Sequence, residues 1–366
     1  MSKFKVIQLL PELNIGGVER GTKDFSKVLV DRGHDSLVIS NGGVFEKDII
    51  EDGGKHINLP IHKKSLFSFR YASDLRDIYL SEKPDIVHVR SRMPAWINYF
   101  AYKKLSHKPL LVSTFHGLYS TPLYSQVMSK VDHIIAISKT VKDYIQGTYK
   151  VPNEKITVIP RGCDPEIFNK NPVEESWIKK WYEEFPQTQD KIILTMPTRI
   201  SKWKGVDSFI DLVNLLDDDN YHALIVGPTA KSKKSYLKQL QNKILNYGIE
   251  DKITITGSRN DISNIYKISD FVFNLSIKPE PFGRTTIEAI SSGSKVLGWN
   301  HGGTKEILEE LYPDGLVELD NIEDLVEKVI NLSNMTNNMP KENTFTSERM
   351  TNQTISLYQD LLAKRL

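Results

Sequence analysis

The sequence has almost no cysteine and no long apolar run. Its 366 residues include a single cysteine, Cys163, which excludes an internal disulfide and favours a reducing compartment. No stretch approaches the ~18 apolar residues that a membrane-spanning helix needs. The first residues are basic but lack the apolar core of a signal peptide. We therefore expect a chain that is neither exported by a recognisable signal nor inserted through a membrane.

Several ligand-binding signatures are also missing. There is no zinc-knuckle, RNP-type or helix-turn-helix pattern, so nucleic acid is not an expected partner. Gly16-Gly17 is not a complete Gly-x-Gly-x-x-Gly, and no acidic residue is well placed to hold the ribose of a nicotinamide cofactor. The three aspartates at 217–219 could imitate an Asp-x-Asp metal motif. They lie between an apolar helical stretch and the strand at 222, so we interpret them as a solvated loop and expect no metal or cofactor.

The bulk composition describes a soluble globular protein of two domains. Hydrophobic residues are 39% and charged residues 26% of the chain, which argues against disorder. Single cores stop growing at about 250–300 residues, and this chain is longer. Residues 1–170 hold 25 basic and 18 acidic residues, whereas residues 171–366 hold 23 and 28. The front half is therefore +7 and the back half −5, which suggests an anionic partner for the front half.

Short Val/Ile/Leu-rich runs alternate with helical stretches along the whole chain, as in sheets whose two faces are both covered by helices. The predicted strands are 4–10, 36–40, 85–89, 110–114, 133–138 and 156–159 in the front half, and 192–196, 222–226, 252–256, 271–275 and 295–299 in the back half. Two such series predict an α/β fold with two Rossmann-like, doubly wound parallel-sheet domains.

Proline and charge clusters near residues 165–185 interrupt the strand series. We predict an acceptor-binding domain at 1–170 and a nucleotide-sugar-binding domain at 171–346, the two roles coming from a resemblance described below. Apolar residues at helical spacing over 347–366 predict an amphipathic helix that packs back on the first domain.

The segment from Glu280 to Gly293 carries the strongest chemical signal. It follows the predicted strand at 271–275, and Pro281 and Gly283 shape a tight loop before a helix that Gly293 can close. Unpaired amides at a helix start favour an anion such as a phosphate. Glu280 lies in the loop and Glu288 about one turn into the helix, so both can face the carboxyl edge of the sheet, where ligands bind in such folds. An isolated pair of glutamates on a capped surface helix would be the ordinary alternative.

An ordered set of motifs resembles the retaining glycosyltransferases with two Rossmann-like domains facing a cleft, the GT-B architecture. Glu280 and Glu288, with Pro-Phe-Gly after the first, resemble the Glu-x7-Glu motif of that family. The glycine loop at 16–21, the His116-Gly117 pair and the basic residues Arg199 and Lys204 resemble further family motifs in the same order. His301-Gly302-Gly303 resembles another glycine-rich turn. The look of the chain, including Arg90–Trp96, is similar to bacterial transferases of family 4 type that build lipopolysaccharide or other cell-surface glycans.

The resemblance implies a role for each matching residue. Glu280 holds the donor sugar and Glu288 the ribose, while Arg199 and Lys204 neutralise the diphosphate. Cations that meet the charge developing on a leaving nucleotide stabilise the transition state and can replace a metal. His116 is expected close to the transferred sugar, as a contact rather than a general base. The retaining enzymes lack a well-placed protein nucleophile, so front-face attack assisted by the leaving phosphate is the expected route.

Other residues are expected to line the donor and acceptor sites. Donor contacts are predicted for Ser258, Arg259, Phe282, Gly283, Arg284 and Thr285. Gly16 and Gly17 allow close backbone approach to the diphosphate or the acceptor, although a plain strand-to-helix turn is an equal alternative. Two positions depart from the family pattern: Thr198 stands where glycine is common, and Arg161 stands where asparagine is common. Arg161 could meet an anionic acceptor or pair with Asp164.

The expected partners are a nucleotide-sugar donor, with UDP-sugar favoured, and a lipid-linked or glycan acceptor. A lipid-linked acceptor would place the chain in the cytoplasm, at the inner face of the membrane. The +7 front half and the basic–aromatic stretches 62–70 and 99–104 favour contact with an anionic membrane surface. The alternative for these stretches is an ordinary amphipathic helix with solvated lysines.

Three functions remain open at this point. The first is a retaining hexosyltransferase. The second is a nucleotide-sugar epimerase or a phosphorylase of the same layout, and the third is a non-catalytic nucleotide-sugar-binding module. A glycosidase is disfavoured, because its two carboxylates must flank the scissile bond rather than lie beside a phosphate site.

Overall fold

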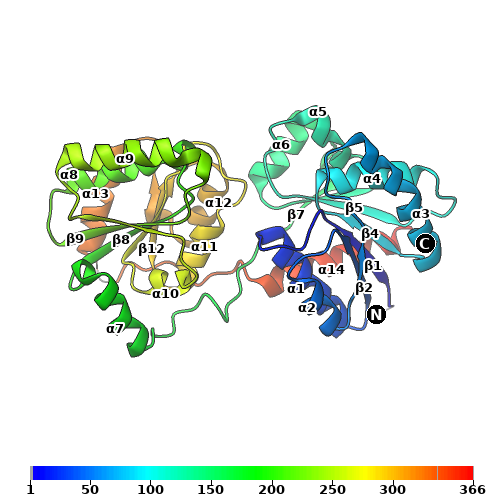
Figure 1. Cartoon of the computed structure of the whole chain (residues 1–366), viewed down its shortest axis with the longest axis horizontal. Coiled ribbons are helices and arrows are strands. Elements are labelled where there is room, and N and C mark those ends of the chain that lie inside the picture. The colour runs from blue at the N-terminus through cyan, green and yellow to red at the C-terminus, as the bar shows by residue number, and fades with distance from the viewer. Residues whose placement is uncertain (1–2, 336, 366) are drawn as a thin grey trace. The chain divides into compact units, whose positions relative to one another are not determined.

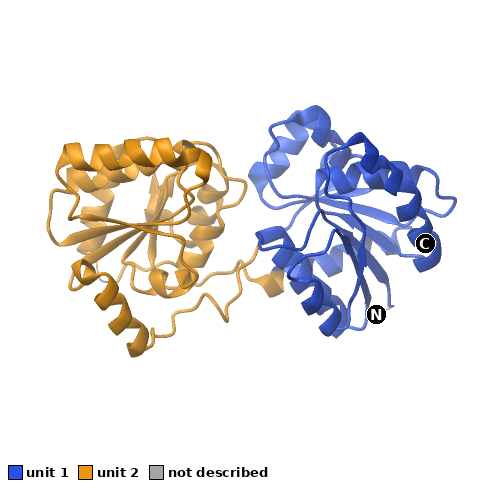
Figure 2. Cartoon of the chain, viewed as in Figure 1, with its two compact units in different colours: residues 1–160, 350–366 blue, residues 161–349 orange. Residues whose placement is uncertain are grey.

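The computed structural model of the chain describes residues 3–335 and 337–365, and Met1, Ser2, Thr336 and Leu366 lie outside this description. The described chain forms two compact α/β units (Figure 2). Unit 1 comprises residues 1–160 and 350–366, and unit 2 comprises residues 161–349. Both sheets are entirely parallel, with helices on both faces in each unit (Figure 1). The predicted fold class of two Rossmann-like domains is therefore confirmed.

Unit 1 has a seven-stranded sheet in the order β3-β2-β1-β4-β5-β6-β7. Its strands are β1 Lys5–Leu9, β2 Asp35–Ser40, β3 Lys55–Asn58, β4 Ile86–Val89, β5 Leu110–Phe115, β6 His133–Ala136 and β7 Ile156–Val158. Its helices are α1 Gly17–Asp31, α2 Glu46–Glu51, η1 Leu66–Arg70, α3 Tyr71–Glu82, α4 Arg92–Lys103, α5 Pro122–Ser125, η2 Gln126–Ser129, α6 Lys139–Tyr149, η3 Asn153–Lys155 and most of α14 Ser347–Ala363.

Unit 2 has a six-stranded sheet in the order β10-β9-β8-β11-β12-β13. Its strands are β8 Ile192–Pro197, β9 Tyr221–Val226, β10 Ile253–Gly257, β11 Phe271–Asn274, β12 Lys295–Trp299 and β13 Leu316–Val317. Its helices are α7 Glu175–Glu184, η4 Pro186–Thr188, η5 Lys202–Lys204, α8 Val206–Leu216, η6 Lys231–Lys233, α9 Lys234–Tyr247, α10 Ile262–Lys267, α11 Arg284–Ser291, α12 Gly302–Leu311, η7 Pro313–Gly315 and α13 Ile322–Ser333.

Two edge strands, β3 and β13, escaped prediction. The β3 sequence Lys-His-Ile-Asn alternates polar and apolar residues, because an edge strand is only half covered. The β13 strand has two residues, too few for a hydrophobic pattern. The eleven predicted strands all appear, with ends that shift by one or two residues.

The helix α14 belongs to unit 1, although it is separated from the rest of that unit by the whole of unit 2. Ile355 and Tyr358 are buried with Phe4, Val6 and other apolar residues of the sheet in one hydrophobic cluster. In Figure 1 the helix, drawn in red, runs along the sheet beside β1. Burial of this apolar stripe is what holds the helix on the sheet.

The two units meet in sequence at Pro160 and Arg161, ten residues before the predicted boundary. Cys163 explains the difference, because its backbone N–H donates to Phe345 O and its carbonyl accepts from Ser347 N–H. Residues 161–170 are thereby tied to the end of unit 2 rather than to the sheet of unit 1.

Candidate functional site

The strand order of unit 2 reverses between β8 and β11, where the chain winds outward in both directions. In open parallel sheets this reversal opens a crevice beyond the carboxyl ends of the strands, and ligands bind there. Arg199 and Lys204 follow β8, and the loop that carries Glu280 follows β11. The structure therefore places three of the predicted site residues at the reversal of one sheet.

Lys204 and Glu280 are in direct contact. The Lys204 ammonium Nζ pairs with Glu280 Oε1, and the two side chains are only 17% and 12% exposed. Ser276 Oγ donates to the same carboxylate oxygen at 2.6 Å, and the Trp203 ring lies under the Lys204 ammonium at 4.3 Å from its centroid. A half-buried carboxylate with a cation and a hydroxyl around it is positioned to accept hydrogen bonds from a polyhydroxyl ligand.

Glycines hold the Glu280 loop in place. The backbone of Glu280 accepts a hydrogen bond from Gly303 N–H at 2.8 Å. A Cβ on Gly303 would lie 2.4 Å from Phe282 backbone atoms, and a Cβ on Gly302 would lie 2.8 Å from Glu280 N. His301 bonds through Nε2 to Ser276 O at 2.6 Å. The glycine-rich turn noted in the sequence is thus the surface against which the Glu280 loop packs.

A second glycine contact fixes Lys204. Gly205 has φ +75° and approaches the end of β11 so closely that a Cβ would lie 1.9 Å from Leu275 O. The Trp203 carbonyl accepts from Ile277 N–H at 2.9 Å. The turn that carries Lys204 is therefore fastened to the neighbouring strand, and its ammonium has little freedom to leave the Glu280 loop.

The helix α11 starts as the sequence predicted. Gly283, at φ +101°, is its N-terminal cap, and Gly293, at φ +97°, follows its end in a left-handed conformation. Glu288 lies one turn in and is 8% exposed, and Arg284 donates from Nη2 to Glu288 Oε1 at 2.8 Å. The start of the helix at Arg284 and Thr285 is accessible, which suits an anion at the free amides.

Phe282 lies on the inner side of this loop. It is 5% exposed and packs edge-on against Phe345 at 5.9 Å between ring centroids. The packing shows that Phe282 anchors the loop, and its predicted contact with a donor stays a prediction.

Arg199 is exposed at the end of β8, and no carboxylate pairs with it among residues 3–335 and 337–365. The neighbouring Gly227, at φ +153°, lies where a Cβ would be 2.0 Å from Thr198 O. The backbone before Arg199 is therefore fixed while its guanidinium is available to an anion.

Arg259 is occupied within unit 2. Its guanidinium donates to both carboxylate oxygens of Glu184 at 2.8 and 3.0 Å and to Asp261 at 2.8 and 2.9 Å. These hydrogen bonds raise the pKa of Arg259 above its usual value. Its charge is neutralised locally, so a donor contact of Arg259 stays a prediction, whereas the exposed Ser258 after β10 is open to solvent.

In unit 1 the strand order reverses between β1 and β4, and Gly16 caps the N-terminus of α1 beyond β1. The Glu19 carboxylate lies over Gly16, 2.2 Å from where a Cβ would stand. A carboxylate at a helix start already occupies the favourable place for an anion. Gly17 is exposed beside it, and this arrangement suits a neutral hydroxyl better than a diphosphate.

His116 follows β5, one strand beyond the reversal, and is half-buried. Its backbone N–H donates to Tyr119 Oη at 3.4 Å. The structure places it at the carboxyl edge of the unit 1 sheet, where the sequence predicted it.

Arg90 is a residue whose individual role the sequence did not reveal. It ends β4 at the reversal of unit 1, is 6% exposed, and donates from Nε to Gln8 Oε1 at 2.9 Å. Burial lowers its pKa to about 10. A basic residue directly after a buried strand was the available signal, and it was read only as part of a family look.

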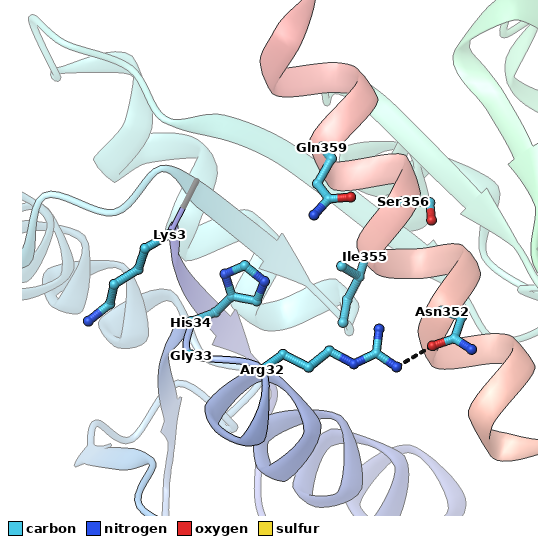
Figure 3. A pocket seen from close by; sticks show the side chains of 8 residues that line it. All are labelled: Lys3, Arg32, Gly33, His34, Asn352, Ile355, Ser356 and Gln359. Carbon is cyan, nitrogen blue, oxygen red and sulfur yellow. Dashed lines mark hydrogen bonds between the residues drawn. The ribbon is translucent and has the colours of Figure 1, made fainter. Parts of the chain in front are cut away.

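A pocket of about 630 Å³ in unit 1 lies away from these residues. It is lined by Lys3, Arg32, His34 and residues of α14, and Arg32 points across it toward Asn352 (Figure 3). These residues surround the amino ends of β1 and β2, the edge opposite to that at which ligands bind in open sheets. We therefore assign this hollow to the docking of α14.

No described helix is both long and apolar enough to cross a membrane. Among the residues that the structure describes, no group of three or more His, Cys, Asp or Glu side chains gathers in a way that could hold a metal ion.

Comparison with known families matches both halves of the chain. Residues 15–167 match the family described as Glycosyltransferase Family 4, and residues 178–347 match the family described as Glycosyl transferases group 1. The two matches together span most of the chain and divide it as the two units do.

Solved structures show the same fold over the full length. A glycosyltransferase from Rickettsia africae is 30% identical, covers 99% of both chains and superposes with a TM-score of 0.85. The Anabaena protein HepE, solved with UDP and glucose, is 20% identical over 98% of this chain and all of its own, with a TM-score of 0.77.

One relative of known activity belongs to human phosphatidylinositol N-acetylglucosaminyltransferase, of which it forms one component. It is 25% identical over 81% of this chain, and the match spans 62% of the human protein's length.

Proposed function

This chain belongs to the GT-B glycosyltransferases of the family 4 type, and from that premise we propose that it is a retaining hexosyltransferase. It moves a hexose from a nucleotide-diphosphate sugar, with UDP-sugar favoured, to a lipid-linked or cell-envelope glycan acceptor. The observation that carries the proposal is the contact of Lys204 with Glu280 at the strand reversal of unit 2, beside the accessible start of α11.

The proposed roles follow from the chemistry of these groups. Glu280 accepts hydrogen bonds from the sugar hydroxyls, and Glu288 accepts them from the ribose. Arg199, Lys204 and the amides at the start of α11 surround the diphosphate. As the bond between the sugar C1 and the phosphate oxygen breaks, negative charge grows on the phosphate, and fixed cations stabilise it. The acceptor oxygen bonds to C1 on the same face, and its proton passes to the leaving phosphate oxygen.

Two relatives support the choice of substrates. HepE was solved with UDP and glucose, which favours a uridine nucleotide and a hexose for a chain with the same fold. The name of the human relative contains a lipid acceptor, phosphatidylinositol, which favours a lipid-linked acceptor here. A lipid acceptor brings the chain to the cytoplasmic face of a membrane.

Replacement of Glu280 tests the proposed donor site. We expect Glu280→Gln to lower the turnover of UDP-glucose by about 100-fold or more, because the sugar loses its anionic acceptor and Lys204 loses its partner. The exposed α12 residue Glu309, changed to Gln, is the control and should keep its turnover. Circular dichroism and UDP-induced stabilisation, about 2.7 kcal/mol at 100 times the dissociation constant, show that both variants are folded.

The same assay separates the remaining alternatives. Labelled UDP-sugar is incubated with and without a glycan or lipid acceptor, and with inorganic phosphate. Product without an acceptor would indicate an epimerase, and dependence on phosphate would indicate a phosphorylase. Binding of UDP-sugar with no turnover under any condition would indicate a non-catalytic module. Proton NMR of the product reports the anomeric configuration, and inversion would contradict the proposed mechanism.

A further inference from the structure

Three segments of unit 1 form one continuous surface, the η1–α4 face, defined as residues 62–70, 92–104 and 119–130. Phe69 of η1 packs edge-on against Phe100 of α4 at 5.1 Å between ring centroids. Trp96 of α4 donates from Nε1 to Tyr124 O of α5 at 2.8 Å. Segments that are far apart in the sequence are thereby joined through aromatic side chains of α4.

An open hollow of about 510 Å³ lies in this face. Phe69, Trp96, Phe100 and Tyr124 supply aromatic walls, and Leu66 lies at its edge. Arg92 also lines it, with its guanidinium 5.4 Å from the Tyr124 ring centroid. The hollow combines apolar walls with a cation, which suits an apolar chain that carries an anionic group.

Large apolar side chains surround the hollow and point into solvent. Leu66, Phe67 and Leu123 are 83%, 84% and 82% exposed. A cluster of such residues on one face marks an interaction surface, because water contact with apolar groups is unfavourable.

The charge of the face has one sign. The three segments contain seven basic residues and no aspartate or glutamate. The side chains of Lys103 and Lys130 both lie over the Tyr99 ring, at 4.4 and 5.0 Å from its centroid. Exposed aromatic and aliphatic groups bordered by basic residues are the composition of protein surfaces that lie in the interface of an anionic bilayer.

We propose that the η1–α4 face docks unit 1 on an anionic lipid bilayer. Leu66, Phe67 and Leu123 enter the interface, the hollow takes up part of a lipid chain, and the lysines contact lipid phosphates. This inference deepens the proposed function and rests on it for its purpose, which is to bring the acceptor site to a membrane-held acceptor. A second copy of the chain fits poorly, because two such faces would bring seven positive charges against seven.

Flotation with vesicles tests the proposal on the full chain. We expect the protein to float with vesicles of phosphatidylcholine and phosphatidylglycerol at low salt, and to stay at the bottom with phosphatidylcholine alone. The triple variant Leu66→Ser, Phe67→Ser and Leu123→Ser should lower the bound fraction by about tenfold or more, because interfacial partitioning scales with buried apolar area. Exposed side chains make few contacts, so the variant should fold.

The matched control replaces three other exposed leucines, Leu80, Leu215 and Leu245, with serine, and it should float like the wild type. A second variant, Lys63→Glu with Lys64→Glu, should lose the dependence of flotation on anionic lipid. Failure of the wild type to float, or equal flotation of the triple variant, would overturn the proposal. So would a wild-type dimer in light scattering that the triple variant abolishes.

UDP binding is measured on the same samples by thermal shift. Lost flotation with intact UDP binding assigns the defect to the η1–α4 face. Absence of UDP binding in a wild type that floats would contradict the proposed donor and leave the docking surface standing.

Discussion

The contact between Lys204 and Glu280 gives each residue a partner before any donor arrives. A buried carboxylate and a buried ammonium are both costly when alone, and pairing lowers that cost. Under the proposed function the incoming diphosphate supplies Lys204 with a second anion, and the sugar hydroxyls supply Glu280 with hydrogen-bond donors. The same pair that stabilises the empty loop is thus ready to divide between the two parts of the donor.

Gly303 offers a test at the scale of a single atom. We expect Gly303→Ala to lower kcat/KM for UDP-sugar by about 100-fold, because its Cβ would lie 2.4 Å from the Phe282 backbone and displace the Glu280 loop. Steady-state kinetics at varied donor concentration measures the effect.

The control for this substitution is Gly147→Ala in α6, where a Cβ meets nothing within 4 Å. Alanine favours a helix over glycine, so this variant should keep its activity and gain about 0.5–1 kcal/mol of stability. Equal kinetics for the two variants would show that the Glu280 loop does not depend on Gly303.

At the scale of elements, α14 is attached to the unit 1 sheet by apolar burial and by one buried polar chain. Tyr358 Oη is hydrogen-bonded to His88 Nδ1 of β4, and His88 Nε2 is bonded to Thr114 Oγ1 of β5 at 2.7 Å. Burial raises the pKa of Tyr358 well above its usual value, so this hydroxyl keeps its proton. The bonds fix how the helix is rotated and shifted along the sheet, which apolar packing alone specifies less sharply.

Removal of the Tyr358 hydroxyl tests this attachment. We expect Tyr358→Phe to lower the free energy of unfolding by about 1–3 kcal/mol, because a buried hydrogen bond is lost. Urea unfolding followed by fluorescence measures the change. Tyr247→Phe in α9 is the control, since that exposed hydroxyl bonds Asp211 at the surface and should matter by less than about 0.5 kcal/mol. An unchanged midpoint for Tyr358→Phe would contradict the proposed anchoring.

The strand β9 predicts how stability depends on pH. Burial lowers the pKa of His222 to about 4, and its Nε2 is bonded to Thr254 Oγ1 at 2.8 Å. The imidazole has a pKa of about 6.5 in the unfolded chain. The unfolded state therefore binds the proton first as the pH falls, and stability is lost between about pH 6.5 and pH 4.

We expect His222→Gln to reduce this loss by up to about 3 kcal/mol, since the shift is roughly 2.5 units. Urea unfolding at several pH values between pH 7 and pH 4 measures it. His107→Gln, at an exposed position, should leave the pH slope at its wild-type value. Identical slopes in the wild type and His222→Gln would show that His222 is not the proton site.

At the scale of the whole molecule, charge is divided between the halves of the chain, +7 in residues 1–170 and −5 in residues 171–366. The basic half contains the η1–α4 face, and the acidic half contains the proposed donor site with its local cations Arg199 and Lys204. Docking at an anionic surface would therefore be carried by one half and would leave the donor site of the other half to be served by its own residues.

The proposed use of protein cations also predicts the response to metal removal. We expect EDTA to leave the turnover of UDP-sugar within about twofold, because Arg199, Lys204 and the start of α11 take the role of a divalent ion at the diphosphate. Product release from labelled UDP-sugar, with and without EDTA and added Mg²⁺, measures this. A loss of activity that Mg²⁺ restores would mean that the diphosphate is held by a metal.

Local pattern in the sequence was sufficient for the strands, the helix start at Gly283 and the place of both glutamates. These features depend on neighbours within a few residues, such as buried apolar runs, a glycine at a positive φ and a loop before a helix. The edge strands β3 and β13 were missed, because partial burial weakens the pattern on which strand prediction depends.

The sequence by itself determined two parallel-sheet domains and the carboxyl edge at which the predicted residues would lie. Only the tertiary structure decided that Lys204 pairs with Glu280, that Arg259 is neutralised by Glu184 and Asp261, and that residues 161–170 belong to unit 2. It also decided that η1, α4 and α5 share one basic–aromatic face. The physical reason is range, since strand and helix signals arise between sequence neighbours, whereas ion pairs and surfaces join residues that meet only after the chain has packed.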